Sequence, residues 1–153
     1  MPDMLTGASF LTVVDLVPLV SIDLIVINPA DQILLGRRRN RPAQGCWFVP
    51  GGRIHKLEKI AQAMIRISQS EIGISVSPDS ARLLGVYDHI YDDNYQGVAG
   101  VSTHYVVLAY EYNLSNGDQV TPDDQHERFV WWDKEELLVS PDVHGNTKAY
   151  FSN

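Results

Sequence analysis

The chain has 153 residues, of which 44% are apolar and 20% charged, a size and composition typical of one globular domain. Its net charge of −7 disfavours a nucleic-acid partner, because phosphate backbones attract basic surfaces. No apolar run reaches the roughly 18 residues of a membrane span, and the chain does not open with a signal-peptide pattern. The single cysteine, Cys46, excludes an intrachain disulfide and fits a cytoplasmic location. We therefore expect one domain over residues 1–153, without nucleic-acid or membrane partners.

The first part of the chain predicts a helix followed by two strands. Apolar residues at helical spacing indicate a short helix within residues 4–17. The β-branched run from Leu19 to Ile27 predicts a strand, and the segment from Gln32 to Arg38 predicts its returning partner in a hairpin. Strand alternation places Ser21 and Asp23 on one face and the apolar side chains on the other. By alternation alone, Asp23 is either a solvent-facing carboxylate or a pocket residue.

The next unit reads as a strand, a glycine loop and a helix. The run Trp47–Val49 leads into Gly51 and Gly52, which we expect to form a tight loop. The following segment, residues 58–72, has a helical pattern, and Gly73 stands where a left-handed glycine ends a helix. One stripe of this helix is expected to carry Ile60, Met64 and Ile67.

The second half of the chain predicts strands joined by polar loops. We expect three strands and two short helices, at residues 82–91, 102–112, 128–132, 134–139 and 146–151. In the loop that begins at Asp92 and Asp93, adjacent acidic residues are better explained as solvated turn formers than as a metal site. This order of elements predicts an α/β fold with one mixed sheet flanked by helices.

A basic cluster interrupts the acidic balance of the chain. Four of the twelve basic residues lie between Arg37 and Arg41, where a predicted strand ends. Such a run is often only a solvated loop. Because it precedes the glycine–helix unit, we interpret it as an oxyanion clamp, since guanidinium groups bind phosphate oxygens in pairs.

The glycine–helix unit resembles the Nudix box, the metal-binding motif of the Nudix hydrolases. Six of its nine positions match, namely Gly52, Glu58, Arg66, Glu71, Gly73 and Ile74. Ile67 and Ser70 stand where the box has glutamates, and Ser68 stands where it has an aliphatic residue. Magnesium prefers several oxygen ligands, so Glu71 requires help from other groups for the site to bind metal.

The departures and the flanking segments are similar to one branch of the family, the GDP-mannose mannosyl hydrolases. The similar segments are residues 18–23, 40–45, 47–53, 91–94, 103–108 and 124–126. The resemblance implies a Nudix-type α/β/α sandwich with a mixed sheet between helices, a homodimer, Mg²⁺ as cofactor and a nucleotide sugar as substrate.

The resemblance also implies roles for individual residues. Magnesium would bind the Gly51 carbonyl, the Glu71 carboxylate and the Gln125 amide oxygen. Arg38 and Arg53 would stabilise the departing diphosphate, and His126 would be the general base, since an imidazole titrates near neutrality. The substrate-binding residues would be Asp23, Arg38, Arg53, Arg66, His89 and Tyr105.

Two expectations about these residues come from their positions in the predicted helix and strand. Glu58 and Arg66 lie near the two ends of the predicted helix, where an ion pair between them would orient the loop. Alternation turns His104 and Tyr105 to opposite faces, so only one can face the pocket, and the resemblance favours Tyr105.

The reaction implied is attack by water on the anomeric carbon, which releases GDP and the inverted free sugar. GDP is a good leaving group, so no general acid is required. GDP-glucose is an alternative substrate. A pyrophosphatase that splits the diphosphate, and a binding domain that holds little metal, are alternative functions.

Overall fold

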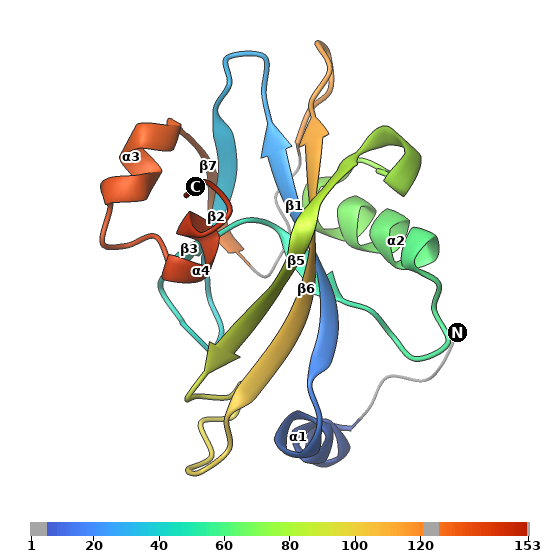
Figure 1. The fold of residues 1–153 in the computed structure, drawn as a ribbon, viewed down its shortest axis with the longest axis vertical. Helices are drawn as coiled ribbons and strands as arrows, with labels where there is room; N and C mark the ends of the chain where they lie inside the picture. Colours follow the sequence, from blue (N-terminus) through green and yellow to red (C-terminus); the bar gives the residue numbers. More distant parts are fainter. Residues whose placement is uncertain (1–5, 121–125, 153) are drawn as a thin grey trace.

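The computed structural model describes residues 6–120 and 126–152, with side chains omitted for 126–128 (Figure 1). The helices are α1 (Gly7–Leu16), α2 (Ile60–Ile72), the 3₁₀ helix η1 (Pro78–Ser80), α3 (Lys134–Val139) and α4 (Gly145–Lys148). The strands are β1 (Leu19–Ile27), β2 (Ile33–Arg38), β3 (Trp47–Phe48), β4 (Gly51–Arg53), β5 (Arg82–Tyr91), β6 (Thr103–Asn113) and β7 (His126–Trp132).

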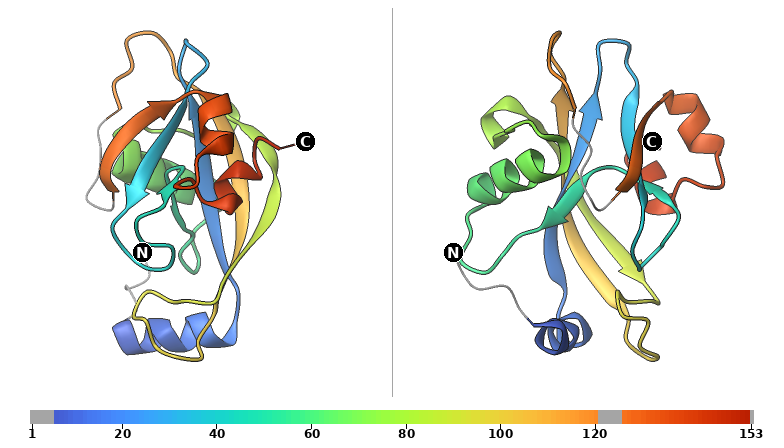
Figure 2. Two further views of the ribbon diagram at one scale, coloured as in Figure 1. Left: turned by 90° about the vertical axis from the view of Figure 1, so that its left-hand side faces the viewer. Right: turned by 180° about the vertical axis from the view of Figure 1, so that it is seen from behind.

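These strands form one mixed sheet, as predicted. The order along the sheet is β3-β2-β1-β6-β5, with β4 paired to β1 and β7 paired to β2. The β1 and β6 strands run parallel along their length, whereas the other pairs are antiparallel. Helix α2 covers one face, and α3 and α4 cover the other (Figures 1 and 2). The α/β/α sandwich is therefore confirmed.

Helix α2 is held to the sheet by its apolar face. Met64 and Ile67 are buried against β1, where Ile22 and Leu24 are fully buried. Burying each such side chain contributes about 1.5–3 kcal/mol. The helix ends at Gly73 in the predicted left-handed conformation, with φ of 75°. Ile60, at the first turn of the same stripe, is 45% exposed.

The opposite face carries a second apolar cluster. Leu137 of α3 and Tyr150, just after α4, pack with Ile25 of β1 and Leu35 of β2. The final helix is shorter than predicted and ends at Lys148, but the chain continues in a turn that brings Tyr150 back onto the sheet.

The predicted hairpin and glycine loop are both wrong in detail. Strands β1 and β2 pair only next to their turn, at Ile27 and Ile33. Beside the centre of β1 lies β4 instead, with Asp23 opposite Gly51. A Cβ atom at Gly51 would lie 2.3 Å from Asp23 Oδ1, so this glycine is required for close approach of two strands, not for a turn.

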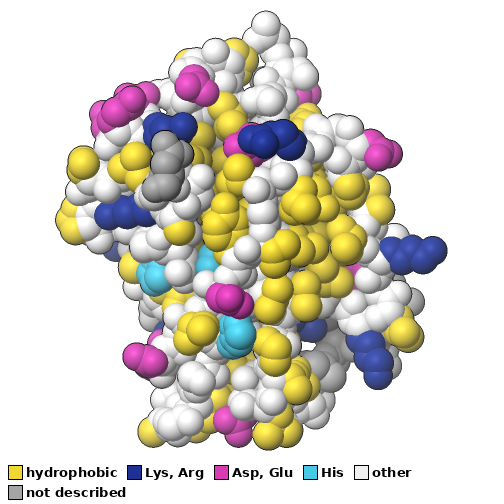
Figure 3. Space-filling model, in the orientation of Figure 1, with side chains coloured by type: hydrophobic (Ala, Val, Ile, Leu, Met, Phe, Trp, Pro, Cys, Tyr) yellow, Lys and Arg dark blue, Asp and Glu magenta, His cyan; other side chains and the backbone are white. Residues whose placement is uncertain are grey.

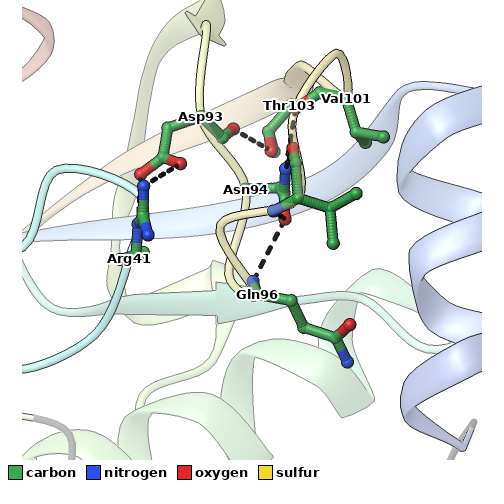
Figure 4. A network of polar contacts seen from close by, with 7 residues as sticks. Arg41, Asp93, Asn94, Gln96, Val101 and Thr103 are labelled. Carbon is green, nitrogen blue, oxygen red and sulfur yellow. Dashed lines mark hydrogen bonds and ion pairs between the residues drawn. The ribbon is translucent and has the colours of Figure 1, made fainter.

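The loop between β5 and β6, residues 92–102, has an ordered internal structure that we call the clasp (Figure 4). Asn94 is fully buried, and its side chain donates to the carbonyls of Val98 and Val101 while accepting from two backbone amides. Asp93 forms two 2.8 Å hydrogen bonds with Arg41, which lowers the pKa of Asp93. Asp93 is thus a partly exposed loop residue, as predicted, and it also forms an ion pair that the sequence did not predict.

The outer side of β5 is apolar and open. Val86 is 58% exposed and Ile90 63%, and apolar side chains gather on the face of the molecule in Figure 3. Helix α1 lies across the end of the sheet, where Tyr95 of the clasp donates a hydrogen bond to the Gly7 carbonyl. Within the described ranges, no helix is long and apolar enough to cross a membrane.

Candidate active site

A cavity of about 240 Å³ opens where β1, β4 and the end of α2 meet. Seven of the ten predicted site residues line it, namely Asp23, Arg38, Gly51, Arg53, Glu71, His89 and Tyr105. Ser21, Asn40, Phe48, Val49, Gly52 and Tyr91 complete the lining. The fold therefore collects residues from six strands and one helix around a single space.

Glu71 contributes an unsatisfied acceptor to this cavity. The residue lies in the last turn of α2 and is 3% exposed, and its Oε2 atom has no hydrogen-bond partner in the described part of the chain. A buried carboxylate oxygen without a donor is costly unless a cation neutralises it. Hard oxygen donors suit Mg²⁺, so Glu71 fits the predicted metal role.

Because Ile67 and Ser70 replace two glutamates of the Nudix box, Glu71 is the one box carboxylate in the cavity lining. Ile67 is 2% exposed and packs towards Gly52, and Ser70 is exposed. Ser68 has a structural role, since its hydroxyl accepts a 2.8 Å hydrogen bond from the Val76 amide. Across the described ranges, no group of three or more His, Cys, Asp or Glu residues could hold a metal. A magnesium ion here would depend on neutral oxygen donors, such as the Gly51 carbonyl, together with substrate oxygens.

Glu58 and Arg66 form the ion pair that their positions predict. Arg66 Nε and Nη2 lie 2.7 and 2.9 Å from the Glu58 carboxylate, and Nη2 also donates to the Arg53 carbonyl at 2.7 Å. The hydrogen bond from Arg66 lowers the pKa of Glu58 to about 2, against the effect of burial. Arg66 does not line the cavity but lies behind Arg53, whose backbone it anchors. Its predicted contact with the substrate stays a prediction.

Two arginines in the cavity are each packed on an aromatic ring. The guanidinium carbon of Arg38 lies 5.2 Å from the ring centre of Phe48, and that of Arg53 lies 4.8 Å from Phe10 of α1. These contacts hold the charged groups without neutralising them, so both remain able to bind an anion. The sequence does not predict the contribution of Phe10, because α1 and β4 are distant in the chain and no local pattern links them.

Asp23 and His89 meet through Tyr150. The Tyr150 hydroxyl donates to Asp23 Oδ2 at 2.5 Å and lies 3.2 Å from His89 Nε2. Burial raises the pKa of Asp23 to about 6, although Tyr150 and Arg38 act in the opposite direction. Burial, assisted by His144, lowers the pKa of His89 to about 4, so the imidazole is neutral at pH 7. Burial and the nearby Asp23 raise the pKa of Tyr150, which therefore stays protonated.

The alternation predicted for residues 104 and 105 is observed. Tyr105 lines the cavity, and burial raises the pKa of its hydroxyl. His104 lies on the other side of β6, where Nε2 is 3.0 Å from Asp88 Oδ1. His104 is therefore excluded from this cavity.

The predicted base, His126, is the first residue of β7. The backbone of His126 pairs with Arg38 of β2, so β7 begins two residues before its predicted start. This pairing brings the backbone of the proposed base next to a cavity arginine. The predicted metal ligand Gln125 lies outside the described residues, and its role and that of the His126 imidazole stay predictions.

Comparison with known proteins identifies the family. The NUDIX domain model matches residues 17–152. The chain is 41% identical over 113 residues to the low-salt glycan biosynthesis protein Agl8 of Haloferax volcanii, covering 73% of this chain and 69% of that protein. It is 31% identical over 110 residues to the ADP-ribose pyrophosphatase of Methanocaldococcus jannaschii, covering 72% and 59% respectively.

Solved structures agree with this result. A MutT NUDIX hydrolase from Burkholderia pseudomallei aligns with a TM-score of 0.69 and 28% identity, over 88% of this chain and 95% of that chain. The MutT protein from Methanosarcina mazei Go1 has the same fold, with a TM-score of 0.70 and 18% identity over 88% and 91%. None of these names specifies a mannosyl hydrolase, so that finer resemblance stays a prediction. Because the family model spans most of its length, the chain belongs to the NUDIX domain family, the Nudix hydrolases.

Proposed function

We propose that this protein hydrolyses GDP-mannose to GDP and mannose, with Mg²⁺ as cofactor and with water attacking the anomeric carbon. As a Nudix hydrolase it acts on a nucleoside diphosphate linked to a further group. The observation that carries the proposal is the buried carboxylate of Glu71, whose Oε2 has no hydrogen-bond partner among the described residues and which lines the same cavity as two arginines. The printed name of the Haloferax volcanii relative, a glycan biosynthesis protein, is consistent with a sugar-containing substrate.

The charge of the cavity favours departure of a diphosphate over attack on it. Attack at phosphorus is assisted by several metal ions held by several carboxylates, and here Ile67 and Ser70 replace two of them. Arg38 and Arg53 carry charge that can stabilise a leaving diphosphate. Magnesium bound at Glu71 and Gly51 would supply further positive charge to the phosphate oxygens.

The other side of the cavity suits a sugar. Asp23 and His89 offer polar atoms deep in the cavity, and Tyr105 and Tyr91 add aromatic surface. With the sugar between these groups and the arginines, water would have to attack the face of the anomeric carbon opposite the bond to the diphosphate. His126 is the proposed base that would accept the proton of the attacking water, and a single displacement inverts the anomer.

Hydrolysis in ¹⁸O-labelled water tests this proposal. Attack at carbon places the label in mannose and leaves GDP unlabelled, and the sugar first appears as the β-anomer in NMR spectra. Labelled nucleotide, or release of mannose 1-phosphate, would instead assign the chain as a pyrophosphatase, the activity named for the Methanocaldococcus jannaschii relative. Parallel reactions with GDP-glucose measure the sugar preference.

The proposal includes a homodimer in the cytoplasm. Sedimentation of the purified protein would measure the association state, and a monomer at assay concentrations would remove this part of the proposal without affecting the chemistry.

A further inference from the structure

We propose that Tyr150 is a positioning residue, whose hydroxyl fixes the hydrogen-bonding polarity of Asp23 and His89 in the cavity. Both partners line the cavity, whereas Tyr150 does not. Tyr150 therefore acts on a substrate only through these two side chains. The kinetic consequence rests on the proposed function, but the proton arrangement does not.

The geometry holds the tyrosine hydroxyl between its two partners. Tyr150 is 7% exposed, and its ring packs edge-on against Tyr87 at 4.8 Å. Its oxygen lies 2.5 Å from Asp23 Oδ2 and 3.2 Å from His89 Nε2. These two residues belong to β1 and β5, which are separated in the sheet by β6. One hydroxyl thus bridges side chains from two different strands.

Counting protons gives the direction of each hydrogen bond. A tyrosine hydroxyl has one hydrogen, and the shorter contact, to Asp23, assigns that hydrogen to the carboxylate. Towards His89 the oxygen can then only accept, so Nε2 must carry the imidazole proton. A neutral imidazole protonated at Nε2 has Nδ1 as a bare acceptor. The reverse order would require Asp23 to be protonated and to donate to Tyr150.

This arrangement determines what the cavity can recognise. With Asp23 as a carboxylate and His89 as the Nε2–H form, both residues direct acceptors, not donors, towards any group not already bonded to Tyr150. Hydroxyl groups are donors, so the pair is set for a ligand rich in hydroxyl groups, such as a sugar. Loss of the Tyr150 hydroxyl would let the imidazole proton move between the two nitrogens.

Nitrogen NMR of the substrate-free protein tests the proton arrangement directly. We expect ¹⁵N spectra of the wild-type protein to show His89 protonated at Nε2, with His89→Gln used to assign its signals. In Tyr150→Phe we expect a mixture of the two tautomers. Tyr87→Phe removes a hydroxyl from the neighbouring ring and should leave the His89 signals unchanged. Wild-type His89 protonated at Nδ1, or a tautomer unaffected by Tyr150→Phe, would overturn the inference.

Kinetics with GDP-mannose and Mg²⁺ test the consequence. We expect Tyr150→Phe to lower kcat by about tenfold, with a smaller change in KM, because misdirected hydrogen bonds matter most in the transition state. If Tyr150 served folding alone, Tyr150→Phe would have a lower melting temperature, but its kcat and its His89 tautomer would equal those of Tyr87→Phe. This result would overturn the proposal. If neither protein hydrolyses GDP-mannose, the proposed function fails, while the NMR result still decides the role of Tyr150.

Discussion

Replacing Glu58 by Gln tests whether Glu58 stabilises the fold of the Nudix box through its ion pair with Arg66. The substitution keeps the size of the side chain and the acceptor that binds the His55 amide at 3.0 Å, but it removes the charge that pairs with Arg66. The pKa of Glu58 falls from 4.5 to about 2 in the folded protein. A shift of this size corresponds to at most about 3 kcal/mol. Because Arg66 is 29% exposed and partly screened by water, we expect a loss of about 2 kcal/mol.

The stability that Glu58 contributes should depend on pH in a definite direction. A carboxylate whose pKa is lowered by folding stabilises the protein above its unfolded pKa, and the stabilisation disappears as pH falls through the folded value. The difference in unfolding free energy between wild type and Glu58→Gln should therefore be full at pH 7 and shrink between pH 4.5 and about 2. Urea unfolding at pH 7, 4 and 3 measures it. An equal difference at pH 7 and pH 3 would refute the assignment of this stability to the ion pair.

The same chemical change at Glu71 is the matched control. Glu71 is buried without a hydrogen-bond partner at Oε2, so Glu71→Gln should leave stability unchanged or raise it. Its hydrolysis rate should fall by several orders of magnitude, since the only charged metal ligand is lost. Glu58→Gln should lose activity by roughly 10–100-fold, as is usual for groups that orient a metal site. Equal losses of activity in the two variants would contradict these separate roles.

Three other predictions concern the cavity. Arg38→Ala should lower kcat/KM for GDP-mannose more than Arg39→Ala, because Arg38 lines the cavity and Arg39 does not. A larger loss in Arg39→Ala would contradict the observed register. His126→Leu should lower the rate by roughly 10²–10⁴ and flatten the acidic limb of the pH–rate profile, whereas a near-normal rate would assign the base to another group. Gly51→Ala should lower the melting temperature, because its Cβ would lie 2.3 Å from Asp23 Oδ1 and 2.6 Å from a backbone oxygen. Gly145→Ala is the control, because a Cβ atom at Gly145 would meet open space. Equal melting temperatures for Gly51→Ala and Gly145→Ala would contradict the predicted clash.

The sequence predicts well what depends on local pattern. Alternation within one strand places Ser21 and Asp23 together, and both line the cavity. The left-handed conformation of Gly73 follows from its place at the end of a periodic segment. Box spacing places Glu71 at the cavity because one helix fixes its direction relative to the glycines of β4.

What the sequence does not predict depends on contacts between distant segments. Tyr150 is 127 residues from Asp23, and its segment predicts only a short helix. Likewise, the pairing of Gly51 with Asp23 replaces the expected hairpin partner, because β2 leaves β1 after its turn and β4 takes the vacant edge. Gly51 itself offers a signal for this pairing, since a glycine in an extended segment often marks a close backbone approach.

The clasp between β5 and β6 has a use for protein engineering. Its shape is fixed internally by Asn94, while the exposed ion pair between Asp93 and Arg41 fastens it to the segment that carries Asn40 into the cavity. At Gly97 an added Cβ would lie 2.1 Å from Arg41 Nη1, and φ there is 68°. An alanine at this position would displace the Arg41 guanidinium from Asp93 and strain the backbone at a positive φ, without altering any residue of the cavity wall. Position 97 is therefore a place outside the cavity where the ion pair between the clasp and the Asn40 segment can be weakened.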